Sequence, residues 1–312
     1  MNVIITSITD DGAGIRIFEL AGAGGAPLPP YAPGAHIDVT LGNGLVRQYS
    51  LCCRQPSPAA YRIVVKREPA SRGGSAWLHE TAATGDILQI GAPRNAFGLA
   101  TGAGPHLLLA GGIGITPLLS MAHALARRGE DFRLACFARD AASLAFRHEL
   151  QDPILRAHVS LHAGLDAPQT AAAIAALLSG FANAQVYTCG PAPFMASVAQ
   201  QATARFGAAR FHQESFNAPQ PSAGDAPFLL RLKDGREIAV AANRSALSCL
   251  QEAGVEVPCS CEVGVCGTCQ TALLAGQADH RDSFLSEEEK ASGKWFMPCM
   301  SRAKSAVLEI DL

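Results

Sequence analysis

Short apolar runs alternate with turn residues over the first hundred positions of the chain. The runs lie at residues 1–6, 15–20, 36–41, 47–52, 61–66 and 87–90. Each has the length of a strand, and residues typical of turns lie between them. The pattern predicts an antiparallel sheet or small β-barrel, which we assign to a domain of residues 1–102.

From residue 106 the pattern changes to buried strands that alternate with helical segments. Strands are expected at residues 107–110, 132–138 and 186–188, and residues 117–128 have helical periodicity. This alternation is typical of a parallel α/β sheet. We therefore expect an α/β domain over residues 103–215.

A proline-, alanine- and serine-rich segment without apolar periodicity follows, and we assign residues 216–226 to an interdomain linker. Residues 225–312 hold 13 acidic residues against 9 Lys or Arg, whereas the preceding 224 residues hold 14 against 16. The change in charge supports a boundary, and residues 227–312 are expected to form a third domain.

Composition narrows the class of protein. The 312 residues are 48% hydrophobic and 17% charged, which favours a folded multidomain protein, and a net charge of -2 argues against nucleic acid as a partner. Residues 100–126 carry no Lys, Arg, Asp or Glu, but glycines and Pro117 interrupt them, so we expect strand, loop and helix there and no membrane anchor. Without an export signal the protein is expected to be cytoplasmic, where clustered cysteines bind metal.

Four cysteines near the C-terminus have the spacing of an iron–sulfur site. Cys261, Cys266 and Cys269 form a C-x4-C-x2-C run, and Cys299 follows thirty residues later. Thiolates at this spacing hold a plant-type 2Fe-2S cluster, and glycines between them let the backbone fold closely around it. The third domain is therefore expected to be an α+β plant-type ferredoxin domain.

A structural zinc site is the alternative for these cysteines, although zinc sites usually combine two close C-x2-C pairs and this chain has one. Cys259 lies two residues before the first ligand and is an alternative ligand or a free thiol. The other five cysteines are expected to be small buried hydrophobic residues.

Two segments of the first domain combine the groups that a flavin phosphate and ring would contact. The first closes a β-rich stretch with a cation, an aromatic ring and a hydroxyl, and the second is a glycine-rich turn before a helical segment at residues 76–79. Amides at a helix start can cradle a phosphate, although a capped helix without a ligand has the same features. The candidate residues are Arg47, Tyr49, Ser50, Lys66, Gly73, Gly74 and Ser75.

Two glycine turns end strands of the α/β domain, where ligands bind in open sheets. One is the Gly-Gly-Ile-Gly-Ile-Thr-Pro sequence of residues 111–117, and the other is the Thr-Cys-Gly-Pro sequence of residues 188–191. Each favours a pyrophosphate, and a plain strand-to-helix turn is the alternative. The candidate residues are Gly112, Gly114, Thr116, Cys189, Gly190 and Pro191.

With these motifs in this order, the whole chain resembles the phthalate dioxygenase reductase family, which includes the reductase of vanillate O-demethylase. The resemblance implies that FMN binds at the Arg-x-Tyr-Ser-Leu and Gly-Gly-Ser segments, and NADH at the two glycine turns. Residues 280–282 and 299–302 look like family signatures around the cluster, whereas a cysteine at position 259 departs from the family pattern.

The resemblance also implies a function, the reductase component of a two-component oxygenase, with a terminal oxygenase of the Rieske type as partner. Hydride carries two electrons and the cluster accepts one, so a flavin must stand between them. We expect the nicotinamide to stack on FMN with Cys189 and Thr116 near the reacting atoms, and Ser50 to bond the hydride-accepting nitrogen of the flavin.

Two other functions account for part of the sequence. A stand-alone NADH-dependent flavin or ferric reductase would not need the tethered ferredoxin domain, and a non-enzymatic electron carrier would not need two nucleotide loops. Preference for NADH over NADPH is expected: Arg139 lies at a strand end where a 2′-phosphate could be met, but Asp140 beside it would repel one.

Overall fold

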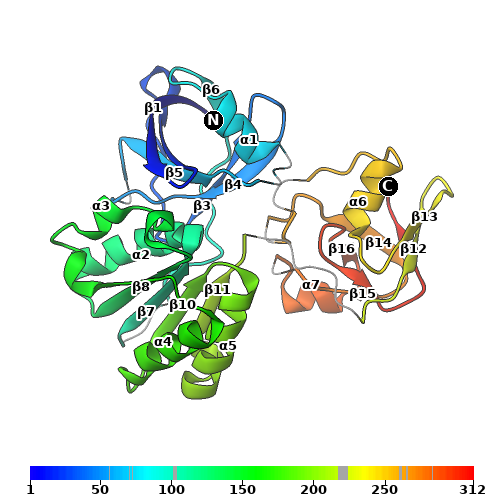
Figure 1. The fold of residues 1–312 in the computed structure, drawn as a ribbon. Helices are drawn as coiled ribbons and strands as arrows, with labels where there is room; N and C mark the ends of the chain where they lie inside the picture. The colour runs from blue at the N-terminus through cyan, green and yellow to red at the C-terminus, as the bar shows by residue number, and fades with distance from the viewer. Residues whose placement is uncertain are drawn as a thin grey trace. The chain divides into compact units, whose positions relative to one another are not determined.

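The computed structural model describes residues 1–55, 57–69, 71, 73–100, 104–216, 224–259, 262–264, 266–282 and 284–312. The chain divides into two compact units, Met1–Phe216 and Asn217–Leu312, whose elements are labelled in Figure 1. The predicted linker lies largely outside the described residues, and its residues 224–226 form neither helix nor strand.

Six antiparallel strands form the first sheet, in the order β4-β3-β6-β1-β2-β5, and the sheet curls into a barrel (Figure 1). A strand is present at each of the six predicted positions. The first is longer than predicted, because it pairs with the second through a tight hairpin in which Ala13 and Gly14 have positive φ. The elements are β1 (Asn2–Gly12), β2 (Ile15–Gly22), β3 (His36–Thr40), β4 (Val46–Ser50), β5 (Ala60–Lys66), α1 (Gly74–Glu80) and β6 (Ile87–Ile90).

Five parallel strands form the second sheet, in the order β11-β10-β7-β8-β9, as the alternation of strands and helices predicted. Helix α2 begins two residues before the predicted start, since Pro117 is tolerated in a first helical turn. It ends at Arg128, before Gly129, where φ is 65°. The elements are β7 (His106–Gly111), α2 (Ile115–Arg128), β8 (Phe132–Ala138), α3 (Arg147–Leu150), β9 (Val159–Ala163), α4 (Ala167–Ser179), β10 (Gln185–Cys189), α5 (Ala192–Phe206) and β11 (Phe211–Glu214).

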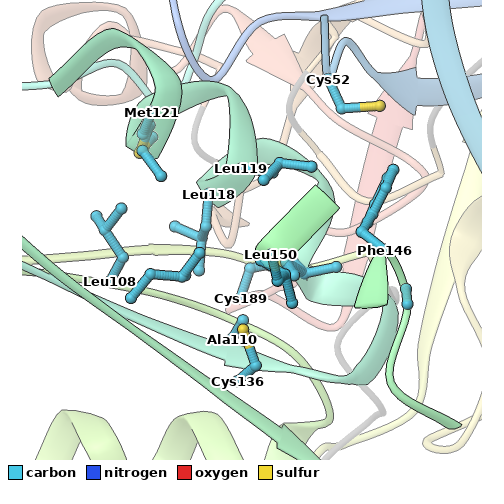
Figure 2. Close-up of a cluster of buried hydrophobic side chains, with 14 of the residues drawn as sticks. Cys52, Leu108, Ala110, Leu118, Leu119, Met121, Cys136, Phe146, Leu150 and Cys189 are labelled. Carbon is cyan, nitrogen blue, oxygen red and sulfur yellow. The ribbon is translucent and has the colours of Figure 1, made fainter. Parts of the chain in front are cut away.

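One apolar cluster is shared by the two sheets. Along β7, Leu108 and Ala110 join a cluster under α2, whereas Leu107 and Leu109 join a second cluster on the opposite face, under α4 and α5. The cluster under α2 also contains Cys52 from the barrel segment, and Figure 2 shows that side chain among those of the second sheet and its helices. This shared core explains why residues Met1–Phe216 form one compact unit.

The second unit has an α+β fold with two sheets. Its five-stranded sheet has the order β13-β12-β18-β14-β16, with β12 and β18 parallel, and β15 pairs with β17. The elements are β12 (Phe228–Leu232), β13 (Glu237–Val240), α6 (Ala246–Glu252), β14 (Thr271–Ala275), β15 (Ala278–Asp279), α7 (Glu287–Ala291), β16 (Trp295–Phe296), β17 (Arg302–Ala303) and β18 (Val307–Ile310).

Short 3-10 helices cover Ala23–Gly25, Gly112–Gly114, Ala141–Ser143, Arg156–His158 and Ala208–Arg210. Within the described ranges, no helix combines the length and the apolar character that crossing a bilayer requires.

Candidate functional site

The structure brings the two predicted flavin segments together. Arg47 and Tyr49 lie on β4, and α1 begins at Gly74 after a left-handed Gly73. A Cβ atom on Gly74 would stand 2.9 Å from Cγ of Arg47, so the arginine side chain lies directly over the start of the helix. The two segments are in close contact, and Arg47 and the glycine turn can therefore act on one ligand.

Ser50 and Tyr49 supply groups suited to a flavin ring. Ser50 ends β4 and is 7% exposed, and burial raises the pKa of the Tyr49 phenol, which keeps it a neutral hydrogen-bond donor. Lys66 ends β5, where its Nζ lies 3.7 Å from a carboxylate oxygen of Glu68. Among the described residues, no side-chain contact joins Lys66 to the other flavin candidates, so its role stays a prediction.

Sequence reasoning missed Ser71 in this turn. Its Oγ accepts hydrogen bonds from the backbone N–H groups of Gly73 and Ala76, at 3.2 Å each, and from the hydroxyl of Ser75 at 3.0 Å. Ser71 thus caps α1 and holds the predicted phosphate-binding residue Ser75. A serine before two glycines was the available signal, because serine is a common capping residue.

The two nucleotide turns pack against each other at the carboxyl edge of the parallel sheet. Strands β7 and β10 are neighbours, with Ala110 opposite Cys189. A Cβ atom on Gly114 would stand 2.2 Å from the Cys189 carbonyl oxygen, and one on Gly190 would stand 2.8 Å from Cα of Gly111. Glycine is required because the two backbones touch. The structure therefore brings together the two turns that carry the residues predicted to contact the dinucleotide.

Thr116 and Cys189, the predicted residues near the reacting atoms, are both buried. The Thr116 hydroxyl donates to the Ile113 carbonyl at 3.1 Å, which closes the loop before α2. Burial, and then the charge of Glu214, raises the pKa of the Cys189 thiol, so the sulfur is neutral near pH 7.

Glu214 is a site residue that sequence reasoning missed. It ends the edge strand β11 and pairs with Cys189 in the sheet register. Its Oε2 is buried and has no hydrogen-bond partner among the described residues, and burial raises the pKa of its carboxyl to about 8. A neutral carboxyl therefore lies beside the thiol at pH 7.

The predicted NADH-selecting pair lies after β8. The Asp140 carboxylate accepts hydrogen bonds from the backbone N–H and the hydroxyl of Ser143, at 2.8 and 2.9 Å, and these bonds lower the pKa of its carboxyl. Asp140 is thus a fixed, charged side chain at the edge of the sheet where the nucleotide turns lie.

Two of the predicted cluster ligands are in contact in the second unit. Pairing of β14 with β16 brings Cys269 and Cys299 together, and their Sγ atoms are 3.2 Å apart, well beyond disulfide length. The Cys299 contact lowers the pKa of the buried Cys269 thiol, which favours the thiolate that iron requires. Among the described residues no set of three metal-ligating groups is assembled. Cys261 lies outside those residues.

The loop that carries Cys266 fits a close approach to an inorganic core. Its glycines, Gly264 and Gly267, both have φ of 75°, and a Cβ on either would collide with Met300 or Phe284. The N–H of Thr268 donates to the Cys266 sulfur at 3.4 Å, the kind of bond that tunes a cluster. Among residues near the cluster cysteines, Cys259 is half-buried and accepts a hydrogen bond from Gln251.

The two signature segments near the cluster are joined by a buried carboxylate. Asp282 accepts hydrogen bonds from Ser301 at 3.1 Å and from the N–H of Leu285 at 2.9 Å. Arg281 and Arg302 both contact Asp225, whose side chain is 2% exposed. These bonds thus hold together the two segments, one of which contains Cys299.

Comparisons with known proteins identify the relatives of this chain. Residues 231–304 match the family model of the 2Fe-2S iron–sulfur cluster binding domain. The chain is 43% identical over 316 residues to vanillate O-demethylase oxidoreductase of Pseudomonas sp. (strain HR199 / DSM 7063), with 100% of both chains covered. It is 42% identical to phthalate dioxygenase reductase of Burkholderia cepacia, covering 95% of this chain and 92% of that one.

A solved structure has the same architecture over the full length. It is phthalate dioxygenase reductase, described as a modular structure for electron transfer from pyridine nucleotides to [2Fe-2S], with a TM-score of 0.73, 39% identity, and coverage of 100% of this chain and 98% of that one. A flavin barrel, a nucleotide-binding parallel sheet and a 2Fe-2S domain in one chain define a flavin- and iron–sulfur-dependent oxidoreductase. The chain belongs to the phthalate dioxygenase reductase family, whose members are reductase components of oxygenase systems. The predicted family, fold class and FMN and 2Fe-2S cofactors are therefore confirmed.

Proposed function

We propose that this chain uses NADH to reduce FMN and delivers electrons singly, through its cluster, to a terminal oxygenase of the Rieske type. The observation that carries the proposal is the contact between the two nucleotide turns, where Gly114 meets the carbonyl of Cys189 in the same compact unit as the flavin barrel. Such a unit can place a dinucleotide next to a flavin. The oxygenase partner is inferred from the names of the relatives.

In the proposed flavin site, Arg47, Gly73, Gly74 and Ser75 hold the phosphate, and Tyr49 and Ser50 contact the ring. Bound FMN supplies the chemistry that this chain lacks, acceptance of two electrons as hydride and their release one at a time. The chain's contribution is orientation. Arg47 lies over the start of α1, and Ser71 holds the hydroxyl of Ser75 in place.

In the proposed nucleotide site, Gly112, Gly114, Thr116, Gly190 and Pro191 shape the turns that receive the dinucleotide. Cys189 and Glu214 lie beside them, and because both side chains are neutral at pH 7 they add no charge near the nicotinamide. The fixed carboxylate of Asp140 disfavours a 2′-phosphate, so NADH is the proposed donor.

In the proposed cluster site, Cys261, Cys266, Cys269 and Cys299 are the four ligands. The two buried thiols 3.2 Å apart and the glycine loop around Cys266 support this set. Because these ligands must stay reduced, we place the protein in the cytoplasm.

Cofactor analysis and rapid kinetics test the proposal. The purified protein should contain FMN, two irons and two acid-labile sulfides per chain, and NADH should reduce the flavin faster than NADPH does at equal concentration. Zinc without released sulfide would refute the cluster assignment, and a flavin that NADH does not reduce would refute the hydride step.

A further inference from the structure

A buried carboxylate joins the barrel to the nucleotide-binding part of the first unit. The carboxylate oxygens of Glu149, on α3, lie 2.8 and 2.9 Å from the two terminal nitrogens of Arg62, on β5. Its Oε1 also lies 2.6 Å from Nε2 of His123, on α2. The exposed fractions of these side chains are 8% for Glu149, 15% for Arg62 and 3% for His123. Three elements distant in sequence therefore meet at one carboxylate.

The residues around Glu149 make further bonds to the barrel side, and we name residues 146–152 the α3 clip. The N–H of Phe146 donates to a carboxylate oxygen of Asp11 at 2.6 Å, and Arg54 lies 2.9 Å from Asp152. The Arg62 guanidinium also lies over the Phe146 ring, 5.4 Å from its centre. Phe146 has φ of 59°, a strained value for a residue other than glycine, which persists only where neighbours fix it.

The buried charges of Glu149 and Arg62 are not explained by the stability of the interface alone. Taking ions out of water is costly, and apolar residues of similar volume often serve an interface equally well. Burial by itself would raise the pKa of Glu149, but hydrogen bonds from His123 and Arg62 and the charge of Arg62 lower it to about 2. The carboxylate is thus held ionised with directed bonds, which fix angles that apolar packing leaves free.

The clip joins the elements that carry the two proposed binding segments. Helix α2 opens at the nucleotide turn and carries His123 two turns after Thr116. Strand β5 carries Arg62 and leads to Lys66 and the Gly-Gly-Ser turn. Any rotation of α2 against β5 has to break bonds to Glu149.

We propose that Glu149, Arg62 and His123 are positioning residues for hydride transfer, which hold the nucleotide turn at a fixed distance from the flavin segment. The inference rests on the proposed function and adds to it. Hydride transfer needs reacting atoms about 3–3.5 Å apart, so a shift of about 1 Å between the two segments would slow it by up to about a hundredfold.

The test compares Glu149→Gln with the matched control Glu130→Gln in the full-length holoprotein. Glu130 also contacts a buried histidine, His106, at 3.2 Å. Glu130 lies just after the C-terminal end of α2, away from the nucleotide turn, and its described contacts do not reach the barrel. We expect Glu149→Gln to slow flavin reduction by NADH between tenfold and a hundredfold at saturating NADH. FMN content and the rate of reduction by dithionite should equal those of the parent, and Glu130→Gln should match the parent throughout.

Arg62→Lys provides a second variant that keeps a charge opposite Glu149 and loses the two-pronged contact, should Glu149→Gln not fold. It should show the same selective loss with NADH. Parental NADH kinetics in the folded variants would overturn the positioning role, and so would equal losses with NADH and dithionite, which indicate a structural role only. If the parent's own flavin is not reduced by NADH, the proposed function fails, and the positioning role with it.

Discussion

Gly114→Ala is the sharpest perturbation of the proposed nucleotide site. The new Cβ would stand 2.2 Å from the Cys189 carbonyl oxygen and 2.7 Å from the N–H nitrogen of Gly190. Both are backbone atoms, so no side chain can turn away, and the two turns have to separate by about 1 Å to reach ordinary contact. Overpacking of this kind costs about 1–3 kcal/mol of folding free energy.

The same displacement should be visible in the kinetics. A 1 Å error in the nucleotide position corresponds to a loss of up to about a hundredfold in rate, or about 2.7 kcal/mol in the barrier. Stopped-flow measurement of flavin absorbance should therefore show much slower reduction by NADH, with unchanged FMN content and cluster absorbance.

Gly180→Ala is the matched control for this substitution. Gly180 follows α4 with φ of -66°, and the nearest atom to its added Cβ is 3.4 Å away, so alanine fits there. The control should react with NADH at the parental rate. If Gly114→Ala also kept the parental rate, the contact between the two turns would have no part in placing the nucleotide.

Three further predictions concern single carboxylates. Because folding raises the pKa of Glu214 from 4.5 to about 8, the free energy of unfolding of the first unit should fall by roughly 1.4 kcal/mol per pH unit between those values. Urea unfolding of Glu214→Gln should lack this contribution. Equal dependence of stability on pH in the variant and the parent would contradict the raised pKa. Asp225→Asn should lower the free energy of unfolding of the second unit by about 1.5–3 kcal/mol in the same assay. Asp311→Asn, which breaks the exposed pair with Lys233, should lower it little, and equal losses would contradict a stabilising role of the buried Asp225. Asp140→Ala should narrow the preference for NADH in kcat/KM, and an unchanged ratio would remove Asp140 from cofactor selection.

The fold class could be predicted from the sequence because the strongest sequence patterns are local. Strand β7 is buried on both faces and reads as a continuous apolar run, and the glycines of the nucleotide turns follow it directly. The cysteine spacing likewise needs no knowledge of distant residues. Strands β9 and β11, the two edge strands of the parallel sheet, escaped individual prediction. β11 holds only one apolar residue, and Glu214 was missed with it.

Tertiary contacts were beyond the reach of sequence patterns. Glu149 lies 87 positions from Arg62 and 26 from His123, and each residue alone reads as an ordinary polar position. The shared core is hidden for the same reason, because Cys52 meets the second sheet only in the folded chain. The predicted boundary at residue 102 lies outside the described residues and stays a prediction.

The central claim, serial electron flow from NADH through the flavin and the cluster, is tested most directly by removing the cluster alone. In Cys269→Ser, and in a fragment of residues 1–222, NADH oxidation with a two-electron dye should proceed near the full-length rate, since hydride transfer needs only the first unit. Reduction of cytochrome c, a one-electron protein acceptor, should fall at least about tenfold in both, because the carrier that delivers single electrons is absent. Cytochrome c reduction at the full-length rate by either protein would contradict the serial route and favour a stand-alone flavin reductase.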